Sequence, residues 1–245
     1  MALADQPSNV NQRGVWPGQI TLRRGWARAE ARPWNDDEPQ ASLRLLRGGA
    51  AFLGACATHL MSLGAGGVIS PPLPISARRS WEQAGFQTYV DLALMRKSLG
   101  GSALSPDHLV VESPDCDLDA LLEIDAAAFS PFWRFNRAGL EEAIQATSRS
   151  KTLTIQGGEG HPIAYAVVGF GSAISYLQRV AVNPKWQGHG MGRSLVRVAG
   201  RKAQAAGAKV LLLNTQTDND AAITLYEDEG FVRLPEPLTL MRVSG

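Results

Sequence analysis

The stretch that decides the fold reads Gln187-Gly188-His189-Gly190-Met191-Gly192. It follows an apolar segment, Tyr176 to Val182, which ends at a turn and is typical of a strand. After it, apolar residues recur at helical spacing from Leu195 to Ala203, with basic residues on the opposite side. Glycines let the backbone approach a ligand closely, and a helix start offers unpaired N–H groups and a partial positive charge. The stretch therefore predicts either a pyrophosphate-binding loop or a plain tight turn.

The residues that follow favour the binding loop. Lys209 to Thr215 predicts a buried strand, and Asn219 to Phe231 predicts a short helix that ends at a glycine. Two spaced patterns lie here in order, V-x-V-x-P-x-x-Q-x-x-G-x-G from Val180 and N-x-x-A-x-x-L-Y-E-x-x-G-F from Asn219. With both patterns, the chain resembles the GNAT N-acetyltransferase superfamily over roughly residues 107–245. Within that superfamily it is similar to enzymes that acetylate the N-terminal alanine of a ribosomal protein.

The resemblance implies a fold of the α/β (α+β) class, the GNAT fold, in which helices flank a mixed, mostly antiparallel sheet. The pattern of the later half agrees with it. We expect a first strand within 107–112, helices over 118–129 and 136–146, and a hairpin of strands over 151–156 and 163–169. Before the second helix lies an aromatic group that either lines the acceptor site, as the resemblance implies, or belongs to the core. Its members are Phe129, Phe132, Trp133 and Phe135.

The resemblance also implies a reaction and a cosubstrate. Acetyl-CoA would give its acetyl group directly to a primary amine, either a small molecule or a protein N-terminus, without an acyl-enzyme. Asn219 would bind the pantetheine side or serve as a helix N-cap, and Tyr226 would be the catalytic general acid or else a buried aromatic. The backbone of the preceding strand would pair with pantetheine and polarise the thioester carbonyl through Val180, Ala181 and Val182. The pyrophosphate would be held by Gln187, Gly188, His189, Gly190, Met191, Gly192, Arg193 and Ser194.

The sequence does not identify the general base. Many relatives carry Glu about where Gln178 stands, and an amide cannot accept the proton of the amine. Glu123 and Asp125 on the first predicted helix are other candidates, and a chain of water molecules is a further one. His189 is expected to point from the loop into solvent.

An internal repeat organises the N-terminal half. Residues Trp81 to Phe86 align with Tyr226 to Phe231 at an offset of 145, and upstream glycines and downstream strand residues align at similar offsets. We therefore expect a flexible N-terminus over 1–15, a truncated, degenerate GNAT-like domain over 16–104 and a catalytic domain over 105–245. This tandem plan is similar to that of mycothiol synthases.

The N-terminal copy departs from the superfamily where the chemistry would occur. Its counterpart of the loop keeps only the final glycine, Gly49, and Trp81 stands where Tyr226 stands. An indole N–H is not a useful acid. We therefore expect this copy to support the structure or close the substrate cleft, and expect a single active site.

Composition restricts the remaining functions. A net charge of +1 argues against a protein that binds nucleic acid electrostatically, and 44% hydrophobic residues suffice for a core. Cys56 and Cys116 lie in unrelated contexts, so neither a disulfide framework nor a metal site is expected, and a cytoplasmic location is natural. Residues 48–77 lack charge, but polar residues and glycines interrupt them, so we expect a buried helix and no membrane span.

Three functions are compatible with this sequence. The first is an acetyl-CoA-dependent N-acetyltransferase. The second is a catalytically silent acyl-CoA sensor or regulatory module, which the amide at Gln178 would favour. The third is a structural partner protein that uses its more basic N-terminal half as a contact surface.

Overall fold

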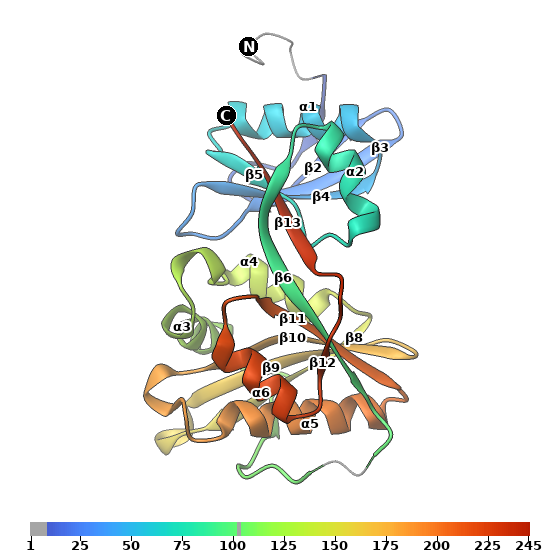
Figure 1. Cartoon of the computed structure of the whole chain (residues 1–245). Coiled ribbons are helices and arrows are strands. Elements are labelled where there is room, and N and C mark those ends of the chain that lie inside the picture. Colours follow the sequence, from blue (N-terminus) through green and yellow to red (C-terminus); the bar gives the residue numbers. More distant parts are fainter. Residues whose placement is uncertain (1–8, 102–103) are drawn as a thin grey trace. The chain divides into compact units, whose positions relative to one another are not determined.

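The computed structural model describes residues 9–101 and 104–245, which divide into two compact units. The first unit comprises the chain up to Leu92 together with Glu236–Gly245, and the second comprises Ala93–Pro235. This division differs from the expected boundary between 104 and 105, and it gives the last ten residues of the chain to the first unit. Figure 1 shows the elements of each unit along the chain.

The first unit is a mixed sheet with two helices. Its strands lie in the order β1-β2-β3-β4-β5-β13-β6, and β4 pairs with β5 in parallel while the other neighbours with a described register are antiparallel. The elements are β1 (Asn11–Arg13), β2 (Ile20–Arg24), β3 (Ala27–Pro33), β4 (Gln40–Arg47), α1 (Ala50–Ser62), β5 (Gly67–Ile69), α2 (Ile75–Gln83), the first part of β6 (Gln87–Ser98) and β13 (Leu238–Ser244).

The second unit repeats this plan with two additional helices. Its strands lie in the order β6-β11-β10-β9-β8-β7, and β12 pairs with the outer side of β6. The elements after β6 are β7 (Val111–Glu112), α3 (Leu118–Ala128), η1 (Pro131–Trp133), α4 (Arg137–Gln145), β8 (Arg149–Gln156), η2 (Gly158–Gly160), β9 (Pro162–Phe170), β10 (Ile174–Val182), η3 (Pro184–Trp186), α5 (Met191–Ala205), β11 (Val210–Gln216), α6 (Asp220–Asp228) and β12 (Val232–Arg233).

These elements confirm the fold class and the internal repeat. In each unit a strand, a helix, a parallel strand and a second helix follow one another, as β4-α1-β5-α2 and as β10-α5-β11-α6. The strand that follows lies outermost in each sheet, and the place beside β5 or β11 is taken from the other half of the chain. β13 takes that place in the first unit, and residues 93–98 of β6 take it in the second. The two copies thus exchange one strand.

The expected flexible N-terminus differs from the structure in part. Residues 1–8 lie outside the described residues, whereas Asn11–Arg13 form β1 and pair with Arg23 to Thr21 of β2. Extended polar residues can occupy an edge strand because its backbone N–H and C=O groups find partners on one neighbour only.

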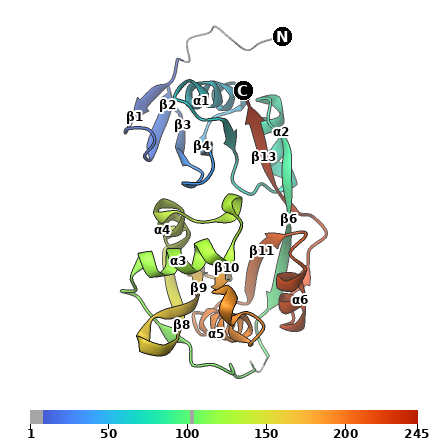
Figure 2. The same cartoon turned by 90° about the vertical axis from the view of Figure 1, so that its left-hand side faces the viewer.

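Two apolar layers sandwich the sheet of the second unit. On one face α5 buries Leu195, Ala199 and Ala203, which recur every fourth residue and lie together as the helical spacing predicts. On the other face α3 and α4 bury Leu121 and Leu140 against β9 and β10. Figure 2 shows these helices on the two sides of the strands.

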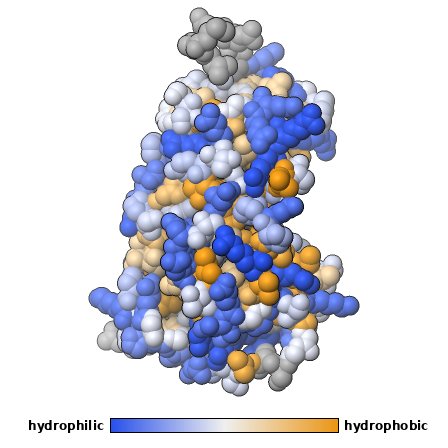
Figure 3. Space-filling model, in the orientation of Figure 1, coloured by the Kyte–Doolittle hydropathy of each residue, from blue (hydrophilic) through white to orange (hydrophobic). Residues whose placement is uncertain are grey.

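The surface of both units is mixed in character. Polar and apolar side chains are interspersed over the face seen in Figure 3. No helix among residues 9–101 and 104–245 combines the length and apolar character that a bilayer crossing needs. The uncharged segment near residue 50 instead forms α1, whose residues Phe52, Leu53 and Leu60 are buried in the core of the first unit.

Candidate active site

A β-bulge in β10 organises the candidate site. Leu177 pairs with Val168 and Arg179 pairs with Val167, so two residues of β10 advance the register on β9 by one. Side chains two apart in a strand normally share a face, and an inserted residue reverses that alternation. Gln178 is the inserted residue. Leu177 therefore packs on the α5 side, whereas Arg179 faces the α3 side.

The bulge escaped the sequence analysis, although a signal is present. Apolar residues alternate up to Leu177, then two polar residues stand side by side at Gln178 and Arg179, and Val180 and Val182 resume the alternation in the opposite phase. Val180 and Val182 accordingly pack against the α5 core, while Ala181 is buried in the α3 core.

Beyond the bulge, one edge of β10 is open. The parallel ladder to β11 joins Ile174, Ser175 and Tyr176 to residues 210–212 and, in the described register, goes no further. β10 itself continues to Val182 and remains paired with β9 on its other side. The backbone groups of Val180 to Val182 that point away from β9 are thus available to an extended ligand, because buried backbone N–H and C=O groups require partners.

The glycine-rich loop connects this open edge to the start of α5. The side chain of Gln187 donates from Nε2 to the carbonyl oxygen of Val182 at 3.1 Å, which ties the loop to the end of the strand. Gly188 and Gly190 have φ values of 78° and 81°, in the left-handed region that favours glycine. A Cβ at Gly192 would lie 3.2 Å from Leu225 Cδ2, so glycine there lets α5 approach α6.

The first turn of α5 has the features of an anion site. Gly190 is the N-cap, and no side chain in the described structure caps the helix. Its first backbone hydrogen bond within the helix runs from Ser194 N to Gly190 O at 3.0 Å, so the N–H groups of Met191, Gly192 and Arg193 precede the helical ladder. Such groups, together with the helix dipole, attract a phosphate.

Two residues expected to hold the pyrophosphate contact protein groups instead. The guanidinium of Arg193 lies 2.8 Å from Asp228 and 3.5 Å from Glu229, at the end of α6. Ser194 is fully buried, and its Oγ accepts hydrogen bonds from the backbone N–H groups of Asp107 and His108 at 3.1 and 3.2 Å.

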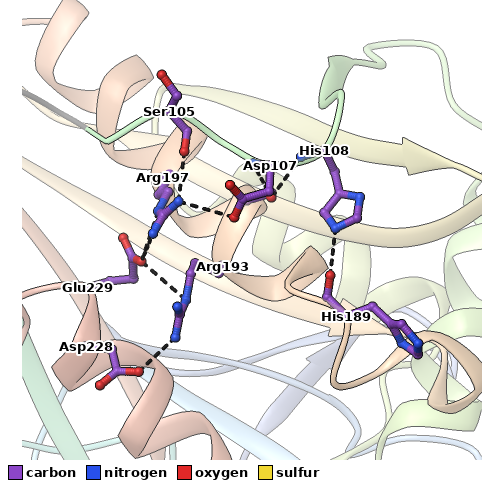
Figure 4. A network of polar contacts seen from close by, with 9 residues as sticks. Ser105, Asp107, His108, His189, Arg193, Arg197, Asp228 and Glu229 are labelled. Atoms are coloured by element: carbon purple, nitrogen blue, oxygen red, sulfur yellow. Dashed lines mark hydrogen bonds and ion pairs between the residues drawn. The ribbon is translucent and has the colours of Figure 1, made fainter.

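Arg197, which the sequence analysis did not single out, extends this network. It donates to Glu229 at 2.9 Å and to the carbonyl oxygen of Ser105 at 2.8 Å, and it lies 3.4 Å from Asp107. The hydrogen bond to Glu229 raises the pKa of Arg197. Figure 4 shows Arg193 and Arg197 side by side, both directed at the acidic end of α6. The network fastens the chain segment before β7 and the end of α6 to the helix that starts at the loop.

Two histidines meet at the loop. His108 Nε2 lies 2.7 Å from the carbonyl oxygen of His189, and the His189 ring is itself exposed, with Nδ1 2.8 Å from the carbonyl oxygen of Gln187 (Figure 4). His189 thus points outward as expected. His108 supports the loop from behind and could not be found from the sequence, because 81 residues separate the two.

Tyr226 lies on α6 and is 8% exposed. Burial raises the pKa of Tyr226 to about 12, and the nearby positive charge of Arg179 opposes that rise. The phenol is therefore protonated at neutral pH, as a proton donor must be. Asn219 caps the same helix, since its Oδ1 accepts from Ala222 N at 3.2 Å while its Nδ2 donates to Gln216 at 3.2 Å. Of the two roles expected for Asn219, the structure shows the cap.

The carboxylates considered as general bases differ sharply in their surroundings. Asp125 is fully buried, and its oxygens accept hydrogen bonds from Arg179, from the hydroxyl of Tyr165 and from the backbone N–H of Phe135. With its lone pairs engaged in this way, Asp125 is not a base for a substrate amine. Glu123 is exposed on α3.

The counterpart of the loop in the first unit is closed. Gly48 has φ of 140°, and a Cβ there would lie 2.9 Å from Phe52 Cδ1, so the Phe52 side chain fills the space beside the turn. Trp81 is 3% exposed and meets Phe86 edge-on at 4.8 Å. This apolar packing supports the expectation that the first copy has no catalytic role.

Comparisons with known proteins agree with this geometry. Residues 118–231 match the model of the acetyltransferase (GNAT) family. Over 183 residues the chain is 28% identical to a mycothiol acetyltransferase of Renibacterium salmoninarum, a match that covers 64% of this chain and 52% of that protein. Over 69 residues it is 41% identical to the N-alpha-acetyltransferase RimI of Mycobacterium tuberculosis, covering 28% of this chain and 42% of that protein. The chain thus spans about half or less of the length of these two relatives.

A solved structure supports the tandem plan. The tandem GNAT protein from the clavulanic acid biosynthesis pathway has a TM-score of 0.62 at 12% sequence identity, with 98% of this chain and 84% of that chain covered. At this identity the likeness shows the fold alone. Taken with the bulged strand, the open edge and the glycine loop, the family match establishes that residues 118–231 belong to the GNAT acetyltransferase family.

Proposed function

We propose that the second unit is an acetyl-CoA-dependent N-acetyltransferase that transfers the acetyl group directly to a primary amine. The observation that carries this proposal is the continuous path from the open edge of β10 to the uncapped start of α5. An extended pantetheine arm would pair with the backbone of Val180 to Val182, and the pyrophosphate would meet the N–H groups from Gln187 to Gly192. The family match and the acetyltransferase relatives support the same reaction.

In the proposed reaction the neutral amine nitrogen attacks the thioester carbonyl carbon, and the carbon–sulfur bond breaks. The backbone of the bulged strand would polarise the carbonyl oxygen, and the protonated hydroxyl of Tyr226 would give its proton to the leaving thiolate. Because Gln178 cannot accept a proton and Asp125 is fully engaged, a water molecule would take the proton of the amine. Arg193 and Ser194 would act on the loop by anchoring α5.

The acceptor in this proposal is a small amine or a peptide N-terminus. RimI is named as an N-alpha-acetyltransferase and the other relative as a mycothiol acetyltransferase, so the relatives support both kinds of acceptor. The proposed compartment is the cytoplasm, where the free thiols of Cys56 and Cys116 would stay reduced.

The test has two stages. Isothermal titration with CoA measures binding, and a thiol-release assay with acetyl-CoA then measures transfer to a panel of amines. The panel contains hexapeptides that differ in the first residue, and glucosamine. Binding of CoA together with amine-dependent thiol release would support the proposal. Binding without release across the panel would contradict it in favour of a silent acyl-CoA module, and absence of binding would contradict both.

A further inference from the structure

A buried arginine links the bulged strand to the segment between α3 and α4. Arg179 donates from Nε to one oxygen of Asp125 and from a terminal nitrogen to the other, both at 2.7 Å. The same terminal nitrogen donates to the carbonyl oxygen of Trp133 at 2.7 Å. Bidentate pairs of this kind fix the orientation of both groups.

Two aromatic rings enclose the same guanidinium. The Arg179 carbon Cζ lies 3.5 Å from the ring centroid of Phe129 and 3.9 Å from that of Phe135. Arginine stacks well on aromatic faces because its guanidinium is planar and weakly hydrated. These two rings therefore pack around Arg179 and against the α3 core, which accounts for half of the aromatic group found in the sequence.

Asp125 completes the attachment of the segment. Its Oδ1 accepts the backbone N–H of Phe135 at 2.7 Å, and its Oδ2 accepts the hydroxyl of Tyr165 at 2.7 Å. The segment from Phe129 to Phe135 is thereby held at two rings, one carbonyl oxygen and one N–H group. Each of these contacts depends on the Arg179–Asp125 pair.

The other two aromatic residues remain outside the apolar cores. Phe132 and Trp133 meet edge to face with ring centroids 4.8 Å apart, and both are half-buried. Neither belongs to the α3 core nor to the α5 core of the described structure. The backbone of this pair is held by Arg179, one residue beyond the bulge and on the open stretch of β10.

We propose that Arg179 is a positioning residue that sets the Phe132–Trp133 pair beside the open stretch of β10 as an apolar wall for the amine acceptor. The proposal rests on the N-acetyltransferase function proposed above. Arg179 would act through the segment it holds and would not contact CoA. It therefore predicts a change in the acceptor's KM that is separate from the binding of acetyl-CoA.

The experiment compares Arg179→Lys and Trp133→Ala with the wild-type chain, and uses the best peptide acceptor of the hexapeptide panel. Arg179→Lys keeps the charge but loses the bidentate and stacked geometry, whereas Trp133→Ala leaves the backbone network intact. Arg137→Gln is the matched control, because Arg137 pairs with Asp119 between α3 and α4 at the exposed surface. Hydrogen exchange of residues 129–136 reports the order of the segment without an acceptor.

We expect both variants to raise the acceptor's KM by roughly 10- to 100-fold, the cost of a misplaced substrate, with the Kd of CoA unchanged. Arg179→Lys should also speed exchange of the Phe135 amide, while amides of α5 stay protected. The double variant should be no worse than the poorer single one, since both act on the same wall. The control should match wild type.

The outcomes separate the two proposals. If wild type transfers no acetyl group, the N-acetyltransferase function fails, whereas the exchange data still test whether Arg179 orders the segment. If wild type is active but Trp133→Ala leaves the acceptor's KM unchanged, the wall is refuted even where Arg179→Lys does not fold. Equal losses in CoA binding and acceptor KM would also overturn the positioning role.

Discussion

The imidazole Nε2 of His108 lies 2.7 Å from the carbonyl oxygen of His189. This contact joins the segment that precedes the first strand of the second unit to the loop that starts α5. A carbonyl oxygen accepts, so Nε2 is the donor and carries the proton. The contact holds one peptide unit of the loop in the orientation that turns neighbouring N–H groups toward a ligand.

Replacing His108 with Ala should weaken CoA binding by about fivefold, because one hydrogen bond contributes about 1 kcal/mol. Isothermal titration measures the change. His161→Ala is the control, since His161 is exposed beside η2 and accepts a hydrogen bond only through its backbone carbonyl in the described structure. Equal affinity of His108→Ala and wild type would show that the contact does not shape the loop.

Tyr226→Phe should lower kcat by roughly 10²- to 10⁴-fold through loss of the proton donor, and leave the Kd of CoA unchanged. Tyr89→Phe, at an exposed tyrosine of the first unit, is the control. A fully active Tyr226→Phe enzyme would exclude the tyrosine as the acid.

The pH profile tests the same group independently. Burial raises the pKa of Tyr226 to about 12, above its unperturbed value of about 10. The donor form therefore persists through about pH 10 and is lost only as pH approaches the raised pKa. Turnover measured with a neutral amine should show no decline below about pH 10, and a decline near pH 8 would assign proton donation to another group.

Gly190→Ala should reduce both stability and CoA affinity. At a φ of 81° an alanine costs about 1–2 kcal/mol, and relief of that strain would turn the first N–H groups of α5 away from the ligand. Gly158→Ala is the matched control, because a Cβ there meets nothing and its φ is not in the left-handed region. Urea unfolding and titration measure the two effects, and wild-type values in both would show that the αL conformation is dispensable.

Glu229→Gln should lower the free energy of unfolding by roughly 1.5–3 kcal/mol, since hydrogen bonds to charged groups contribute that much. The Glu229 side chain is 3% exposed and lies between Arg193 and Arg197. Glu227→Gln, at an exposed site on the same helix, should change little. Urea unfolding compares the two, and equal midpoints would mean that the network does not stabilise the unit.

Local patterns predicted most elements of the second unit because their causes are local. Asn136 caps α4 as expected, with its side chain accepting from Gly139 N, and Asn219 caps α6 in the same way. The glycines of the loop require positive φ regardless of what surrounds them. The repeat was visible because each copy must form the same strand, helix and parallel strand.

The roles of Arg193 and Arg179 were beyond local reasoning. Arg193 follows the loop in sequence, yet its guanidinium meets the acidic end of α6, 35 residues further on. Arg179 faces Asp125, 54 residues away, because the bulge turns it to the α3 side. Which charges pair depends on how strands and helices pack, and spacing along the chain does not encode it.

The sequence by itself determined the family-type order of strand, glycine loop, helix and tyrosine-bearing helix, since backbone conformation and helical periodicity are set by near neighbours. Only the tertiary structure decided the exchange of β6 and β13, the enclosed Arg179–Asp125 pair and the support of the loop by His108. These features join residues that are distant along the chain, and they form because buried polar groups and open sheet edges must find partners wherever the fold supplies them.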